Sequence, residues 1–181
     1  NLKNTKELNR GLGLIFMPNK KEEIEECKLI CEKEAEKLKI NKTSWRTVPV
    51  NYGTLGPLAK ANAPFISQWI LYVDKKGNQD IERLLFQLRK RIEKKIRETF
   101  KNDVGNCEFY FASLSSHTVV YKGMVRSEIL SEFYQDLKND SFKVSFSVYH
   151  RRFSTNTLPK WPLAQPMRFL GHNGEINTLL G

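Results

Sequence analysis

The sequence has no apolar run of about eighteen residues, the length at which a membrane-spanning helix is expected, so we expect no membrane contact. Its first seven residues hold neither an initiator Met nor the apolar core of a signal peptide. Internal repeats, low-complexity tracts and a Gly-rich phosphate loop are also missing from the sequence. We therefore expect a globular piece of a longer protein, cut at both ends.

Cysteine is scarce, and the spacing of the three cysteines is uninformative for metal binding. Cys27, Cys31 and Cys107 are an odd number without a C-x-x-C pair, which argues against a disulfide framework and fits a reducing compartment. Cys27 and Cys31 lie four residues apart on a predicted helix and so share one face. Without further ligands nearby, both are expected to be small buried residues.

Positive charge is abundant, but it is mixed with negative charge. Thirty Lys and Arg residues against twenty Asp and Glu residues give a net charge of +10. Charge of this size can attract nucleic acid or an acidic partner. However, Lys alternates with Glu along the predicted helices, which is typical of a solvated helix face. We expect no nucleic-acid partner. The length of 181 residues suits one ordinary domain, residues 1–181.

Hydrophobic periodicity predicts helices mixed with strands, without regular βαβ alternation, and therefore a layered α+β fold. The clearest helices are expected at 19–38 and 79–100, with a short one capped by Ser127 and reaching 137. The other expected elements are strands at 11–17, 45–51, 66–73, 143–150 and 167–172, a hairpin of 107–114 with 117–123, and a surface loop at 53–64.

Two polar segments near the C-terminal end carry the chemistry. Arg152 follows a predicted strand and opens a polar stretch, Phe-Ser-Thr-Asn-Thr, and its guanidinium can hold a carboxylate with two parallel bonds. About twenty residues later, the side-chain amide of Asn173 and the backbone N–H of Gly174 can face a developing oxyanion. Taken alone, an Arg is more often a surface ion pair and Asn-Gly is an ordinary turn. Together they suit the binding of a small amino acid.

The motifs His150-Arg-Arg-Phe-Ser-Thr-Asn-Thr-Leu-Pro-Lys-Trp-Pro and His172-Asn-Gly-Glu-Ile-Asn-Thr resemble the type-2 glutamine amidotransferase domain of the glutamate synthase large subunit. The resemblance extends along nearly the whole chain, through Trp45-Arg-Thr-Val-Pro-Val-Asn, Ser113-Leu-Ser-Ser-His-Thr-Val-Val-Tyr-Lys-Gly and Phe133-Tyr-Gln-Asp-Leu. It implies the four-layer αββα sandwich of N-terminal-nucleophile hydrolases, incomplete at both ends of this sequence.

The resemblance also implies roles for particular residues. Arg152 matches the residue that binds the α-carboxylate of glutamine, and Asn173 with Gly174 matches the catalytic oxyanion hole. Thr155, Asn156 and Glu175 match neighbouring residues of the substrate pocket. In the full enzyme, glutamine is hydrolysed to glutamate and ammonia, and the ammonia is channelled to 2-oxoglutarate for reductive synthesis of glutamate. This ammonia assimilation uses FMN and a 3Fe-4S cluster, held by other domains of the same polypeptide.

The sequence departs from the family pattern at the nucleophile. The family attacks with an N-terminal Cys followed by Gly, and none of the three cysteines here stands in that context. We therefore expect the segment by itself to be inactive. The electron donor stays open between ferredoxin and an NAD(P)H-dependent subunit, and the compartment between plastid stroma and bacterial cytoplasm. The alternative is a non-catalytic module derived from an amidotransferase, either glutamine-binding or a basic interaction domain.

Overall fold

A computed structural model describes residues 8–74, 80–100, 108–151 and 158–167. The chain divides into two compact units. The first unit consists of Asn1–Thr47 and Pro64–Val119, and the second of Val48–Ala63 and Val120–Gly181. The first unit holds the sheet and the two long helices, whereas the described residues of the second form short helical turns and loops.

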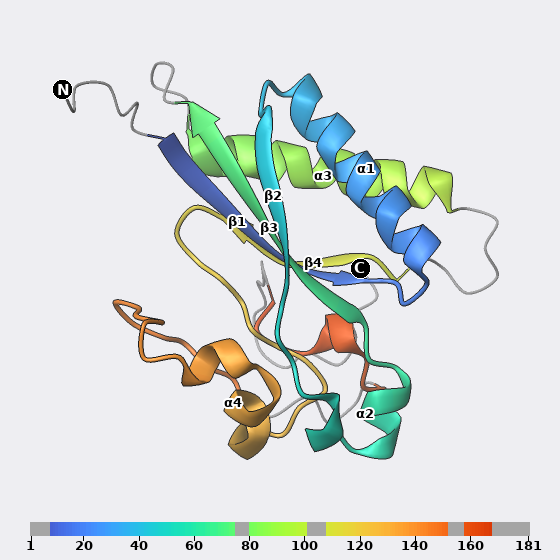
Figure 1. The fold of residues 1–181 in the computed structure, drawn as a ribbon, viewed down its shortest axis with the longest axis vertical. Coiled ribbons are helices and arrows are strands. Elements are labelled where there is room, and N and C mark those ends of the chain that lie inside the picture. The colour runs from blue at the N-terminus through green and yellow to red at the C-terminus, as the bar shows by residue number, and fades with distance from the viewer. Residues whose placement is uncertain (1–7, 75–79, 101–107, 152–157, 168–181) are drawn as a thin grey trace, which may run out of the picture. The chain divides into compact units, whose positions relative to one another are not determined.

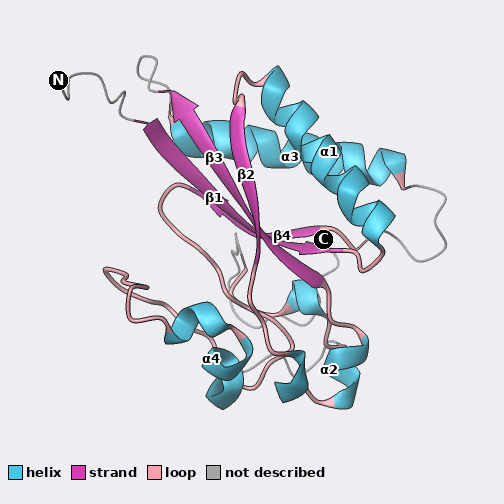
Figure 2. Ribbon diagram, in the orientation of Figure 1, coloured by secondary structure: helices cyan, strands magenta, loops and turns pink. Residues whose placement is uncertain are grey.

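The first unit is built on a four-stranded antiparallel sheet with strand order β2-β3-β1-β4. Figures 1 and 2 show the strands, which are β1 (Leu8–Met17), β2 (Lys42–Thr47), β3 (Phe65–Asp74) and β4 (Tyr110–Ser115). The strands predicted at 11–17 and 66–73 are confirmed. β2 begins earlier than predicted and ends before Pro49, and it lies at the edge of the sheet, where a nearby proline is tolerated.

Two long amphipathic helices pack side by side on one face of this sheet (Figure 1). They are α1 (Lys21–Lys37) and α3 (Ile81–Thr99), which confirms both helix predictions. Asp80 caps α3, because its carboxylate accepts hydrogen bonds from the backbone N–H of Glu82 and Arg83 at 2.9 and 3.4 Å. The apolar stripes of both helices pack into one core, whose helical members are Ile24, Cys27, Ile30, Cys31, Ala35, Leu84, Leu85, Leu88, Ile92 and Ile96.

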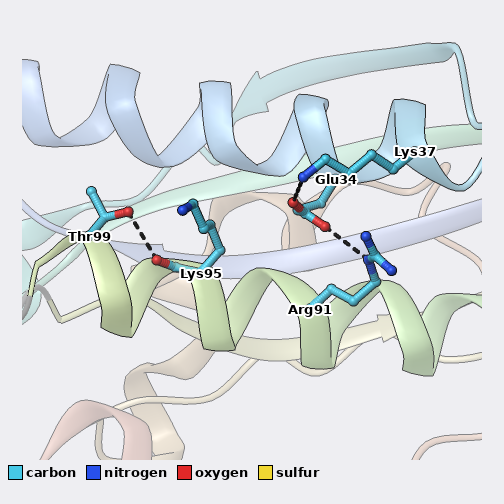
Figure 3. Close-up of polar contacts among 5 residues, drawn as sticks. All are labelled: Glu34, Lys37, Arg91, Lys95 and Thr99. Atoms are coloured by element: carbon cyan, nitrogen blue, oxygen red, sulfur yellow. Dashed lines mark hydrogen bonds and ion pairs between the residues drawn. The ribbon is translucent and has the colours of Figure 1, made fainter.

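A polar contact between the helices lies at the rim of this core (Figure 3). The carboxylate of Glu34 on α1 is buried and accepts hydrogen bonds from Lys37 and from the guanidinium of Arg91 on α3, the latter at 2.9 Å. Burial opposes its ionisation, but these hydrogen bonds and positive charges outweigh that effect and lower the pKa of Glu34 below its ordinary value. The contact between Glu34 and Arg91 therefore links α1 to α3 through an ionised carboxylate.

The predicted hairpin around Ser115 and Ser116 is wrong. β4 pairs with β1, and residues 117–123 form no strand. The chain turns away because side chains satisfy its backbone N–H groups: Ser115 Oγ accepts from His117 and Thr118 at 3.0 and 3.2 Å. The carboxylate of Glu82 accepts from the backbone N–H of Ser116 at 2.6 Å. These bonds replace the ladder that a hairpin would need.

The second unit contains two short α-helices, α2 (Pro57–Ala61) and α4 (Leu130–Phe133), together with 3-10 turns. The loop predicted at 53–64 thus holds a helical turn, because Pro57 occupies the first position of a helix, where its fixed φ is favourable. The single helix predicted from Ser127 to Leu137 is instead broken into three pieces. Ser127 does not cap it, since its hydroxyl bonds to the carboxylate of Glu128 at 3.0 Å.

The strand predicted at 143–150 is also wrong. This segment runs without regular structure, and its apolar members are exposed, with Phe146 at 77% and Val148 at 78%. Alternating apolar residues favour a strand only where a neighbouring strand pairs with it, and the described part of the chain supplies none for this segment. The strand predicted at 167–172 falls largely outside the described residues.

A sheet with helices confirms the α+β class. Within the described ranges, no helix combines the length and the apolar character needed to cross a membrane.

Candidate functional site

All six predicted site residues lie outside the residues that the structure describes. They are Arg152, Thr155, Asn156, Asn173, Gly174 and Glu175. The structure does describe the segment 158–167, which lies in the sequence between a first block of site residues, 152–156, and a second block, 173–175. It also describes Arg151, which is exposed beside the first block. The structure therefore shows which contacts hold segment 158–167.

Trp161 anchors this segment in the second unit. Its side chain is only 2% exposed, and its indole N–H donates to the backbone carbonyl of Ala59 at 3.0 Å. The indole lies against the ring of Phe133, with ring centroids 5.5 Å apart. It also packs directly on Gly123, where an added Cβ would stand 2.3 Å from the indole. Only glycine fits at this position, so Gly123 and Trp161 form one packed contact.

Lys122 holds the same segment from a second direction. Its ammonium donates to the backbone carbonyl of Pro162 at 2.9 Å and to that of Pro166 at 3.4 Å, and the residue is 2% exposed. These two carbonyls flank the turn that follows Trp161. The position of Lys122 is fixed in turn by the hydroxyl of Tyr134, which donates to the Lys122 backbone carbonyl at 2.7 Å.

Tyr134 belongs to an aromatic cluster that supports Lys122. Its ring meets those of Tyr121 and Phe133 edge-on, with centroids 5.0 and 4.7 Å apart. Burial raises the pKa of Tyr134 well above its ordinary value, so the hydroxyl stays protonated and can act as the donor. The isolated bridge between Val50 and Tyr134 ties the cluster to the chain after β2. The residues that hold segment 158–167 thus pack against this aromatic cluster.

The two described cysteines do not suit a nucleophilic role. Cys27 and Cys31 form no disulfide and are fully buried in the core of the first unit, which confirms the prediction that they are small buried residues. Burial, and secondarily the charge of Glu32, raises the pKa of the Cys31 thiol well above its ordinary value. Cys107 lies outside the described residues. Within the part of the chain that is described, no three His, Cys, Asp or Glu side chains group as metal ligands.

The sequence reasoning gave Lys122 no role. Trp161 lies in the motif that follows Arg152, and the structure gives it a buried, hydrogen-bonded position. A signal for Lys122 was available, because a lysine between Tyr121 and Gly123 follows three β-branched residues in an otherwise uncharged stretch. A lysine in such surroundings is buried only when its ammonium is hydrogen-bonded.

The chain belongs to the family of class-II glutamine amidotransferases, whose family model matches residues 1–181. Among its relatives, it is 49% identical over 174 residues to a chloroplastic ferredoxin-dependent glutamate synthase of Oryza sativa subsp. japonica, which covers 96% of this chain. It is 50% identical over 173 residues to ferredoxin-dependent glutamate synthase 2 of Synechocystis sp. (94% of this chain). The chain spans about a tenth of the length of these relatives, 10% in both cases.

Proposed function

We propose that residues 1–181 form part of one domain, the glutaminase domain of a glutamate synthase. That domain hydrolyses glutamine to glutamate and ammonia, and the ammonia is passed to 2-oxoglutarate for reductive glutamate synthesis. The observation that carries the proposal is the match to class-II glutamine amidotransferases along the entire sequence, with relatives named glutamate synthase at about half identity. The four-layer αββα sandwich belongs to this proposal, since the described sheet with helices on one face is compatible with two of its layers.

In the proposed site, Arg152 binds the α-carboxylate of glutamine, and Thr155, Asn156 and Glu175 line the substrate pocket. Asn173 and Gly174 donate to the oxyanion that forms when a thiolate attacks the side-chain amide. Cys27 and Cys31 are buried in the core, so neither is proposed as the attacking thiol. We therefore propose that residues 1–181 by themselves do not hydrolyse glutamine.

The remaining parts of the proposal concern the rest of the enzyme. Ferredoxin is the donor that the names of the relatives give, and it is the proposed electron donor here, with NAD(P)H as the other candidate. FMN and a 3Fe-4S cluster are proposed for further domains of the same polypeptide, as the resemblance to glutamate synthases implies. Relatives from Oryza sativa subsp. japonica and Spinacia oleracea are named chloroplastic, and we propose the plastid stroma or a bacterial cytoplasm as the location.

Two substitutions test the site in a protein of the relatives' length that contains this chain. Arg152→Gln removes the carboxylate partner and is expected to raise the KM for glutamine. Asn173→Ala removes an oxyanion donor and is expected to lower kcat by about 10²–10³-fold. The readout is glutamate released from glutamine at saturating and limiting substrate.

Arg151→Gln is the matched control, because Arg151 is the neighbouring exposed arginine with the same charge. It is expected to keep both constants. Equal effects of Arg151→Gln and Arg152→Gln would contradict the assigned roles. A wild-type protein that binds glutamine with no hydrolysis would favour the non-catalytic module instead.

A further inference from the structure

Charge is divided unevenly between the two long helices of the first unit. α1 contains seven Glu and four Lys residues, whereas α3 contains three Glu and seven Lys or Arg residues. The two helices lie side by side on one face of the sheet (Figure 1). The helical layer therefore has an acidic half and a basic half, which the net charge of the whole chain does not reveal.

The cations of α3 gather on the side of the helix that faces away from the core. At 3.6 residues per turn, Arg83, Lys90, Lys94 and Arg97 fall within a narrow arc opposite the buried stripe of α3. All four residues are exposed. They extend over fourteen residue steps, about 21 Å at the rise of an α-helix. We call these four residues the α3 stripe.

Carboxylates neutralise little of the charge of the α3 stripe. Arg83 and Arg97 form no ion pair with a carboxylate of the described residues. Lys90 and Lys94 each have a glutamate nearby, but at 3.9 Å and with lysine side chains that are 57% and 74% exposed. Exposed pairs of this kind contribute little free energy, so a binding partner can displace them at low cost.

An exposed aromatic ring flanks the α3 stripe. Phe86 is 54% exposed, and the guanidinium of Arg89 lies over its ring, 5.2 Å from the centroid. Phe86 stands on the flank opposite Arg91, the residue that contacts Glu34 of α1. Phe and Arg are enriched at the centres of protein interfaces, and a ring of this kind next to cations provides an apolar anchor.

The neighbouring acidic helix limits which anion can reach the α3 stripe. A wide polyanion such as a DNA duplex would approach both helices together and would meet the exposed glutamates of α1. A single α-helix, about 10–12 Å across, can lie along α3 alone. Carboxylates at three- and four-residue steps share one face of such a helix. Charge complementarity therefore favours an acidic helix over a nucleic acid.

We propose that the α3 stripe and Phe86 form a docking surface for an acidic helical segment of another protein. The carboxylates of that segment pair with the stripe, and one of its apolar side chains covers Phe86. Complementary charge gives such a contact its specificity and its sensitivity to salt. This docking is independent of glutamine hydrolysis.

The test measures binding of a labelled synthetic peptide to the longer protein by fluorescence anisotropy. The peptide is Ala-rich, about twenty residues long, with Glu at three- and four-residue steps and one central Leu. Lys90→Glu with Lys94→Glu is expected to raise the dissociation constant about tenfold or more at about 0.05 M salt. Phe86→Ala is expected to raise it about fivefold, as loss of an apolar anchor does.

Lys21→Glu with Lys33→Glu is the matched control. Both lysines are exposed on α1, and their replacement changes the net charge by the same amount as the α3 double variant. It is expected to change the dissociation constant by less than about twofold. Circular dichroism checks that all variants keep the helical content of the wild-type protein.

Three results would overturn the inference. The first is a wild-type protein that does not bind the peptide at the lower salt concentration. The second is an equal loss in the α1 and α3 double variants, because net charge alone would then account for binding. The third is tighter binding of a DNA duplex, or of vesicles of phosphatidylcholine with phosphatidylserine, through the same α3 residues, which would assign the surface to a different class of partner.

Discussion

At the scale of single residues, the buried ionised groups of the two units serve different purposes. Glu34 joins two helices through Lys37 and Arg91 in the first unit, whereas Lys122 holds backbone carbonyls in the second. Each is expensive to bury and each is compensated by hydrogen bonds. Removing one partner therefore has a larger effect than removing an exposed ion pair.

The first prediction concerns Glu34→Gln. Hydrogen bonds to charged groups contribute about 1.5–3 kcal/mol, so the substitution is expected to lower the free energy of unfolding by about 1–2 kcal/mol at pH 7. Since folding lowers the pKa of Glu34, its contribution is present in full above the ordinary value of 4.5 and is lost as the pH falls through the lowered pKa of the folded state. Urea unfolding between pH 7 and pH 3 measures both effects.

Glu25→Gln is the control for this prediction. Glu25 lies on the same helix and also pairs with a lysine three residues away, but its side chain is 62% exposed. Its replacement is expected to change the free energy of unfolding by less than about 0.5 kcal/mol. Equal losses for the two variants at pH 7 would show that the contact between α1 and α3 adds nothing.

At the scale of elements, local pattern and tertiary pairing disagree in one segment. Residues 143–150 alternate like a strand, yet they form none and leave Phe146 and Val148 in solvent. By contrast, β1 is buried because β3 and β4 pair with its two edges. An exposed apolar stretch of this kind promotes self-association.

The second prediction follows from that exposure. The double variant Phe146→Ser, Val148→Ser is expected to reduce self-association of residues 1–181 in light scattering, and to change the free energy of unfolding by less than about 0.5 kcal/mol. Ser145→Thr with Ser147→Thr, at the alternating polar positions, serves as control and is expected to alter neither. A loss of 2 kcal/mol or more in the double variant, about the cost of opening a buried site, would mean that the two side chains are buried.

At the scale of the whole chain, thirty Lys and Arg residues stand against twenty Asp and Glu residues, which gives a net charge of +10. Several of the helical cations lie next to carboxylates, as in the pairs Lys28–Glu25, Arg89–Glu93 and Arg91–Glu34. Binding to nucleic acid requires cations that can replace the counterions of successive phosphates. Cations already paired with carboxylates do this poorly.

The third prediction is therefore negative. At about 0.15 M salt, no binding to a DNA duplex is expected in fluorescence anisotropy, and any binding at about 0.05 M salt should disappear as salt is raised. A micromolar dissociation constant at the higher salt concentration, with a steep salt slope, would favour a basic interaction module.

Periodicity predicted the first unit well. Apolar residues at three- and four-residue steps located α1 and α3. The two strand predictions that failed share one cause: His117–Gly123 and residues 143–150 have strand-like composition, but neither pairs with a strand of the described sheet. Sequence patterns report which residues suit a strand, whereas pairing depends on partners that are distant in the sequence.

The candidate site also has features that the sequence predicted and features that only the structure shows. The motifs around Arg152 and Asn173 indicated the family and the chemistry from the sequence, because their residue types are those that bind a carboxylate and an oxyanion. No periodicity indicates that the ammonium of Lys122 reaches carbonyls some forty residues further along the chain.

The sequence by itself determined the helices, the core strands and the family to which the chain belongs, because those depend on local spacing and on short motifs. Only the tertiary structure decided that Lys122, Gly123 and Trp161 meet in one buried contact. The physical reason is that burial of a charge and close packing on a glycine depend on neighbours that folding brings together.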